Sequence, residues 1–116
     1  MFEQLIYIST ARASKPSSDE VNAILSVSRT NNVRDDLTGL LIVGGRRFLQ
    51  VLEGPSDRLH RTYERIKKDP RHFAMVELGR VRVAERAFGQ WAMGYEGGHE
   101  SLINVVGKLT RDVVDA

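Results

Sequence analysis

The chain has 116 residues, no cysteine, and 17 basic against 15 acidic side chains. This length suits one domain with its own core. The missing cysteine excludes disulfides, thiolate metal sites and cysteine nucleophiles, and the near balance of charge does not indicate a nucleic-acid-binding surface. The start, MFEQLIYIST, has neither the basic segment of a signal peptide nor the ~20 apolar residues of a membrane span. We therefore expect a cytoplasmic protein without a membrane anchor.

The first two predicted elements are a strand and a helix. Residues Phe2–Ser9 are rich in Leu, Ile and Tyr, which are frequent in strands, and Tyr7 and Ser9 share one face. Ser17 and Glu20 then have the spacing of a capping box, and apolar residues recur at helical intervals to about Thr30. Two asparagines, Asn31 and Asn32, are expected at or just beyond the helix end, where this residue is favoured.

A β-hairpin follows in the segment LTGLLIVGGRRFLQVLEG, in which Gly44 and Gly45 form the turn. Alternation along its second strand places Phe48, Gln50 and Leu52 on one face. Both faces of this strand are largely apolar, which indicates a central, covered strand. Gln50 is thus expected among apolar neighbours, where each unpaired polar group would cost about 1–3 kcal/mol. Some other group must therefore meet its amide.

The second half of the chain is predicted to hold four more elements. Ser56 is the expected N-cap of a second helix, with an apolar stripe that includes Tyr63 and Ile66 and a stop at Asp69-Pro70. Residues 73–83 and 88–96 are typical of strands, and Glu100–Ala116 of an amphipathic helix.

This order predicts an α+β fold, the ferredoxin-like β-α-β-β-α-β pattern, extended by a fifth strand and a C-terminal helix. Such a fold has an antiparallel sheet with two helices across one face. Its first and third strands are central neighbours, so Tyr7 and Gln50 are expected side by side. Many functions use this fold, so the fold alone decides none.

The topology brings polar and aliphatic side chains to one place. Ile24 and Ile66 are expected to face each other from the two helices, with Asn31, Asn32, Arg65 and Asp69 nearby. A slot with apolar walls and a polar rim suits a flat heteroaromatic ligand.

Each of these residues also has a plainer interpretation. Arg65 and Asp69 have the spacing of an i,i+4 ion pair, and Trp91 and Met93 are of the kind that fills cores. Two other functions use the same strand order. An RNA-binding module would stack bases on Tyr7 and Phe48, but GGRRFLQVLE fits its motif poorly. An acylphosphatase-like enzyme would need a phosphate loop with a catalytic Arg and Asn, which we do not find. The histidines, His60, His72 and His99, lack the spacing of metal ligands, so no metal site is expected.

The motifs LIYIST, SRTNNVRDDLTGLLIVGGRRFLQVLEG, YERIKKDPRH and WAMGY resemble those of the BLUF domain, a flavin-binding blue-light sensor. The resemblance covers residues 1–96, which we expect to form the sensor domain, and leaves 97–116 as a helical extension. It implies a photoreceptor and not an enzyme. It also implies noncovalent FAD, with FMN and riboflavin as open alternatives.

The resemblance assigns roles to single residues. Tyr7 is the implied photoactive donor of an electron and a proton, and Gln50 lies between it and the flavin, with Ser9 nearby. Trp91 and Met93 are the implied pair on the fifth strand that reports the light-induced change. The implied flavin contacts are Ile24, Asn31, Asn32, Gln50, Arg65, Ile66 and Asp69.

The resemblance names no output. Because only residues 97–116 follow the sensor, we expect the signal to leave through that helix, to a homo-oligomer or to a separate downstream signalling protein. Neither nucleic acid nor a membrane is an expected partner.

Overall fold

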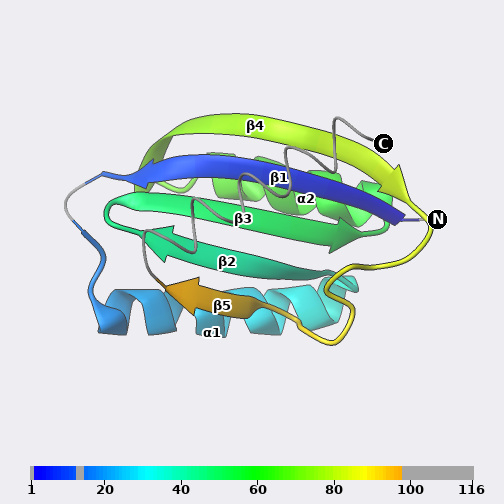
Figure 1. Ribbon diagram of the computed structural model, residues 1–116, viewed down its shortest axis with the longest axis horizontal. Coiled ribbons are helices and arrows are strands. Elements are labelled where there is room, and N and C mark those ends of the chain that lie inside the picture. Colours follow the sequence, from blue (N-terminus) through cyan, green and yellow to red (C-terminus); the bar gives the residue numbers. More distant parts are fainter. Residues whose placement is uncertain (1, 13–14, 98–116) are drawn as a thin grey trace.

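The computed structural model describes residues 2–12 and 15–97 (Figure 1). Within them the elements are β1 (Phe2–Ala11), α1 (Ser18–Asp35), β2 (Thr38–Gly44), β3 (Arg47–Gly54), α2 (Ser56–Lys67), β4 (His72–Val83) and β5 (Gly94–Gly97). The first six have the predicted β-α-β-β-α-β order, which confirms the ferredoxin-like arrangement. The helix predicted for Glu100–Ala116 lies outside the described residues.

The strands form one sheet in the order β4-β1-β3-β2-β5 (Figure 1). The first four strands pair antiparallel, whereas β5 pairs parallel to β2. The central strands β1 and β3 place Tyr7 directly opposite Gln50, as predicted. The β2–β3 turn uses Gly45 in the left-handed region, at φ 59°, where a side chain would be strained.

Alternation along the strands divides the core into two apolar clusters. On one face, Tyr7 and Leu52 pack with Leu25 of α1 and with Leu59 and Tyr63 of α2. The opposite face carries a second cluster: Ile6, Leu40, Ile42, Leu49 and Val51. The predicted alternation on β3 is thus confirmed, and both helices lie on the face that carries Tyr7 and Gln50.

Helix α1 begins as predicted and ends later than predicted. The Ser17 hydroxyl accepts the Glu20 amide at 3.1 Å in a capping box. The prediction that Asn31 and Asn32 lie at the helix end was wrong, because the helix continues to Asp35. It stops at Asp36, whose left-handed backbone (φ 59°) is a conformation that Asp adopts more readily than most residues.

Helix α2 begins one residue earlier than predicted, at the residue expected to be its N-cap. Pro55 occupies the N-cap position, without a side-chain capping bond, and Ser56 is the first helical residue. The Ser56 hydroxyl instead donates to the Glu3 carboxylate at 2.7 Å, so a contact with β1 replaces the local cap. Neither helix in the described part of the chain is long and apolar enough to cross a membrane.

The last described strand is much shorter than the predicted span of residues 88–96. It covers only Gly94–Gly97, so Trp91 and Met93 lie in the loop before it and not on a strand. Strand-like composition was outweighed here by tertiary contacts, since Asn32 of α1 and the amide of Gly39 in β2 bind the backbone of this loop.

Candidate functional site

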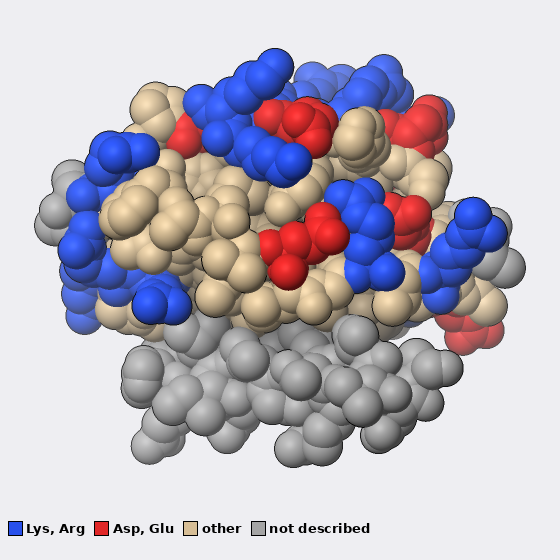
Figure 2. All heavy atoms as spheres, turned by 90° about the horizontal axis from the view of Figure 1, so that it is seen from above, with Lys and Arg blue, Asp and Glu red and all other residues tan. Residues whose placement is uncertain are grey.

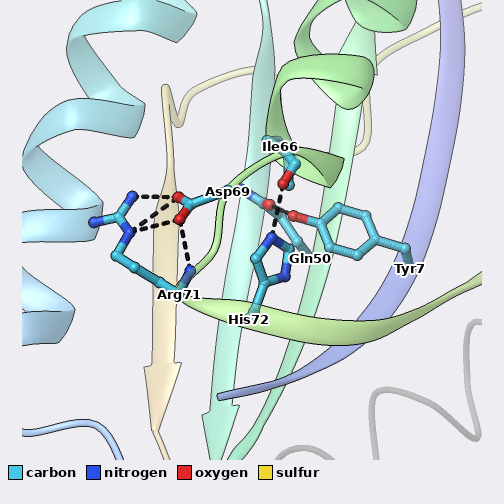
Figure 3. A network of polar contacts seen from close by, with 6 residues as sticks. All are labelled: Tyr7, Gln50, Ile66, Asp69, Arg71 and His72. Carbon is cyan, nitrogen blue, oxygen red and sulfur yellow. Dashed lines mark hydrogen bonds and ion pairs between the residues drawn. The ribbon is translucent and has the colours of Figure 1, made fainter. Parts of the chain in front are cut away.

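A buried tyrosine–glutamine pair lies at the centre of the sheet. Tyr7 is 3% exposed and Gln50 is 6% exposed, and the Tyr7 hydroxyl donates a hydrogen bond to Oε1 of Gln50 (Figure 3). The amide nitrogen of Gln50 donates to the sulfur of Met93 at 3.7 Å. Gln50 is therefore no surface residue, and its amide connects Tyr7 to the loop before β5.

Tyr7 is held in its protonated form. Burial, and then the neighbouring Tyr63 and Asp69, raise the pKa of the Tyr7 hydroxyl well above its ordinary value. The hydroxyl therefore keeps its proton throughout the physiological range, and that proton is directed at the Gln50 oxygen.

A cleft opens beside this pair, between the two helices. Two adjoining cavities, of about 530 and 630 Å³ including the space open to solvent, share Ile24, Gln50, Ile66 and Asp69 in their walls. The isoleucines come from α1 and α2, and both line the two cavities with apolar side chains.

The predicted site residues divide into those that line the cleft and those that do not. Tyr7 and Ser9 line the first cavity, and Asn31, Asn32 and Arg65 line the second. Met93 is buried and reaches the site through Gln50. Trp91 is 49% exposed, stacks on Phe88 at 6.0 Å between ring centroids, and borders a separate surface hollow.

Two side chains of α1 fix the loop that carries Met93. Nδ2 of Asn32 donates to the Ala92 carbonyl at 2.7 Å, and Nε of Arg29 donates to the Met93 carbonyl at 3.0 Å. Asn32 thus has a structural partner in addition to its place in the cleft wall. Arg29 was missed in the sequence because its partner lies 64 residues away and no local pattern signals the contact.

At the mouth of the cleft, Asp69 pairs with Arg71 and not with Arg65. The Arg71 guanidinium binds the Asp69 carboxylate at 2.6 Å, and this bond lowers the pKa of that carboxyl (Figure 3). Arg65 instead lies 4.0 Å from Asp35. The plain interpretation of Arg65 and Asp69 as an i,i+4 pair is therefore wrong, because each charge has a partner in another segment.

Sequence reasoning also missed Arg71, which lines both cavities. It belongs to the short segment Asp69-Pro70-Arg71-His72, and its spacing from Asp69 was the available signal. His72, beside it, contacts the Ile66 carbonyl through Nε2 at 2.7 Å (Figure 3). This contact connects the start of β4 to the end of α2 at the cleft.

The donor set of the cleft fits a flat, polar-edged ring. Two aliphatic side chains form the walls, and the amides of Gln50, Asn31 and Asn32 supply both donors and acceptors at the edge. In the described part of the chain, no group of three His, Cys, Asp or Glu side chains is placed to hold a metal ion. The walls of the cleft thus combine apolar faces with a polar edge.

Comparison with known proteins identifies the family. The family model "BLUF: Sensors of blue-light using FAD" matches residues 2–94. The blue light- and temperature-regulated antirepressor BluF of Escherichia coli K12 is 36% identical over 93 residues, which are 80% of this chain and 23% of the relative. The chain therefore spans less than a quarter of that relative's length.

Solved structures of BLUF proteins have the same fold as this chain. The dark-state structure of BlrB, a BLUF protein, has a TM-score of 0.79 and 29% identity, over 95% of this chain and 82% of that one. Klebsiella pneumoniae BlrP1 with FMN and cyclic diGMP has a TM-score of 0.77 and 34% identity, over 84% of this chain and 26% of that one. Since the family model covers most of the chain and the neighbours share both fold and sequence, the chain belongs to the BLUF family, the sensors of blue light using FAD.

Proposed function

We propose that this protein is a blue-light receptor that binds FAD noncovalently in the cleft between α1 and α2 and has no catalytic turnover. The observation that carries the proposal is the buried Tyr7–Gln50 hydrogen bond in the wall of an apolar cleft. FMN, which is bound in the BlrP1 structure, and riboflavin are the alternatives. They share the ring that the cleft residues suit.

The cleft residues would hold the ring by its faces and its edge. Ile24 and Ile66 would enclose the two faces, because they come from different helices and both line the cleft. Asn31, Asn32 and Arg65 would bind the polar edge, and Asp69 would stay ionised near the ring beside Arg71.

When bound, the flavin absorbs blue light and supplies a one-electron oxidant. Tyr7 is the residue suited to be oxidised, because its hydroxyl is protonated and its proton has an acceptor in Oε1 of Gln50. The two ends of the Gln50 amide differ, since one accepts and the other donates. A rotated or tautomeric amide therefore presents different hydrogen-bonding groups to the cleft and to Met93 without a movement of the backbone.

We propose that the change leaves the cleft through Met93 and then Trp91, which borders the surface. Residues 1–96 would be the sensor domain and 97–116 a helical extension that carries the output. The partner would be a second copy of the chain or a separate signalling protein. The relative BluF, by its name an antirepressor, supports a protein partner.

The arrangement of aromatic side chains disfavours the RNA-binding alternative. Tyr7 and Phe48 both pack against the helix-covered face of the sheet, so neither offers a stacking surface to a base. Figure 2 shows both basic and acidic side chains on one face of the molecule. Among the basic residues, Arg80 is paired to Glu3 and Glu77.

An absorption spectrum before and after blue light tests the proposal. The purified protein, loaded with FAD if necessary, is expected to show flavin bands that shift slightly to the red in light and recover in the dark. Reconstitution with FAD, FMN and riboflavin in parallel ranks the cofactors. Protein that retains no flavin in any of the three would exclude the function.

A further inference from the structure

A fully buried glutamate lies on the sheet face opposite the cleft and takes no part in the site described above. Glu53, at the end of β3, is 0% exposed. Its carboxylate accepts the backbone N–H groups of Ala87 and Phe88 at 2.7 and 2.8 Å. It also accepts Nε2 of Gln4 at 3.0 Å and the hydroxyl of Thr38 at 3.3 Å.

This donor set suits a carboxylate and no other side chain of that size. Four donors converge on two oxygens, and a carboxylate is the acceptor-only group that can meet them all. A buried carboxylate without such partners would be strongly unfavourable. Glu53 therefore specifies the position of residues 87 and 88, which belong to the loop between β4 and β5.

A neighbouring arginine strengthens the same attachment. Arg86 donates to the Thr38 hydroxyl at 3.1 Å and to the Asp36 carbonyl at 2.9 Å. Residues 86–88 are thus bound to β3, to the start of β2 and to the end of α1. We call residues 86–88, held in this way, the loop anchor.

Between the loop anchor and Met93 lies one short turn. The Trp91 amide donates to the Phe88 carbonyl at 3.0 Å, and the Gly39 amide donates to the Trp91 carbonyl at 3.1 Å. Met93 follows two residues later and meets the Gln50 amide. The position of Met93 is therefore set by its own contacts in the cleft and by the loop anchor five residues before it.

We propose that Glu53 is a positioning residue for the light response: it holds residues 87 and 88 so that Met93 meets Gln50, and it makes residue 88 the N-terminal limit of any light-induced displacement in this loop. The inference rests on the proposed function only in its second part, because the light response exists only if the protein is a light sensor. The loop anchor itself can be tested in the dark.

Amide hydrogen exchange by NMR on the protein as purified, in the dark, tests the anchor. The amides of Ala87 and Phe88 are expected to exchange at least about tenfold more slowly than those of the exposed Gly89 and Gln90, as hydrogen bonds to a charged group imply. Equal exchange rates for the four amides would overturn the inference from the wild-type protein alone.

The variant Glu53→Gln tests the positioning role, because an amide has one acceptor oxygen where the carboxylate has two. We expect exchange at Ala87 and Phe88 to rise about tenfold and dark recovery of the red-shifted flavin spectrum to accelerate at least about threefold. Glu3→Gln is the matched control, since the carboxylate of Glu3 binds Ser56 and Arg80 and not the loop. It is expected to leave both measurements unchanged.

The outcomes separate this inference from the proposed function. If the wild-type protein shows no light-induced shift of its flavin spectrum, the proposed function is wrong. The exchange rates at Ala87 and Phe88 still test whether Glu53 holds the loop anchor. Faster exchange in Glu53→Gln with wild-type recovery would reduce Glu53 to a loop anchor and overturn its positioning role. If Glu53→Gln does not fold, slow wild-type exchange at Ala87 and Phe88 supports the inference, and fast exchange overturns it.

Discussion

At the residue scale, the amide of Gln50 has more hydrogen-bonding capacity than the protein uses. Its oxygen accepts the Tyr7 hydroxyl, and its nitrogen, with two donors, makes a long contact to the Met93 sulfur. A thioether is a weak acceptor, so little energy opposes a change of partner. Gln50 is therefore suited to respond to a ligand in the cleft.

Tyr7→Phe is expected to fold and bind flavin but to lose the red shift, because only the hydroxyl is removed. The unpaired Gln50 oxygen would cost about 1–3 kcal/mol of unfolding free energy. Tyr63→Phe is the control, since this ring lies 5.5 Å from that of Tyr7 yet its hydroxyl does not bind Gln50. Light-minus-dark absorption spectra of the two variants measure the red shift. A normal shift in Tyr7→Phe would remove Tyr7 from the mechanism.

The pKa of Tyr7 predicts how pH affects the protein. Because burial raises it above the unfolded value of about 10, the red shift should keep its size from pH 6 to about pH 10. The stability that this group contributes is fully present below pH ~10 and is lost as pH rises toward the folded pKa. Spectra and thermal unfolding across this range provide the measurement. A loss of the red shift centred near pH 10, in protein that is still folded, would contradict a buried Tyr7.

Asn32→Ala should weaken flavin retention and lower the free energy of unfolding by about 1–3 kcal/mol, because the Ala92 carbonyl loses its partner. Asn22→Ala is the control on the same helix, where the side chain is exposed. Flavin content after gel filtration and urea unfolding measure the two effects. Equal behaviour of the two variants would show that Asn32 serves neither role.

At the element scale, α1 supplies one wall of the cleft and also the attachment of the loop before β5. Ile24 lines the cleft, while Arg29 and Asn32 bind the loop from the last two turns. The helix holds Asn32 at this contact because it continues to Asp35. A helix that ended at Thr30 would not place Asn32 to bind the Ala92 carbonyl.

The capping box of α1 predicts a local effect on stability alone. Ser17→Ala should lower the free energy of unfolding by about 0.5–2 kcal/mol, since the Glu20 amide loses its acceptor. Ser18→Ala, one residue into the helix, should change it little. Chemical denaturation followed by circular dichroism measures both variants. The red shift should be unchanged in each, and its loss in Ser17→Ala would mean that the cap shapes the cleft.

At the scale of the whole molecule, the sheet separates two apolar faces with different roles. One face carries the helices and the cleft, and the other carries the cluster defined by Ile6, Leu40, Ile42, Leu49 and Val51. Trp91, in the loop that leads to the edge strand β5, is 49% exposed and stacks on Phe88, which packs against the second cluster. The loop that carries Met93 and Trp91 therefore extends from the cleft to the surface.

Deletion of Glu100–Ala116 should leave the flavin photocycle largely intact, because the cleft residues precede this segment. It should expose apolar surface and change the oligomeric state, since the segment has an apolar stripe that must pack against something. Light scattering in the dark and in light provides the measurement. An unchanged mass with equal solubility would show that the segment is not the output element.

Local sequence patterns were sufficient for the element order, the two faces of β3 and the capping box of α1. Periodicity and capping act over a few residues, so they can be read without a fold. The pairing of Tyr7 with Gln50 also followed, once strand order was inferred. Only the tertiary structure decided that α1 continues past its asparagines, that Asp69 pairs with Arg71, and that Glu53 binds residues 87 and 88. These contacts depend on the packing of the elements, because each polar group takes the best partner within reach in space, whatever its separation along the chain.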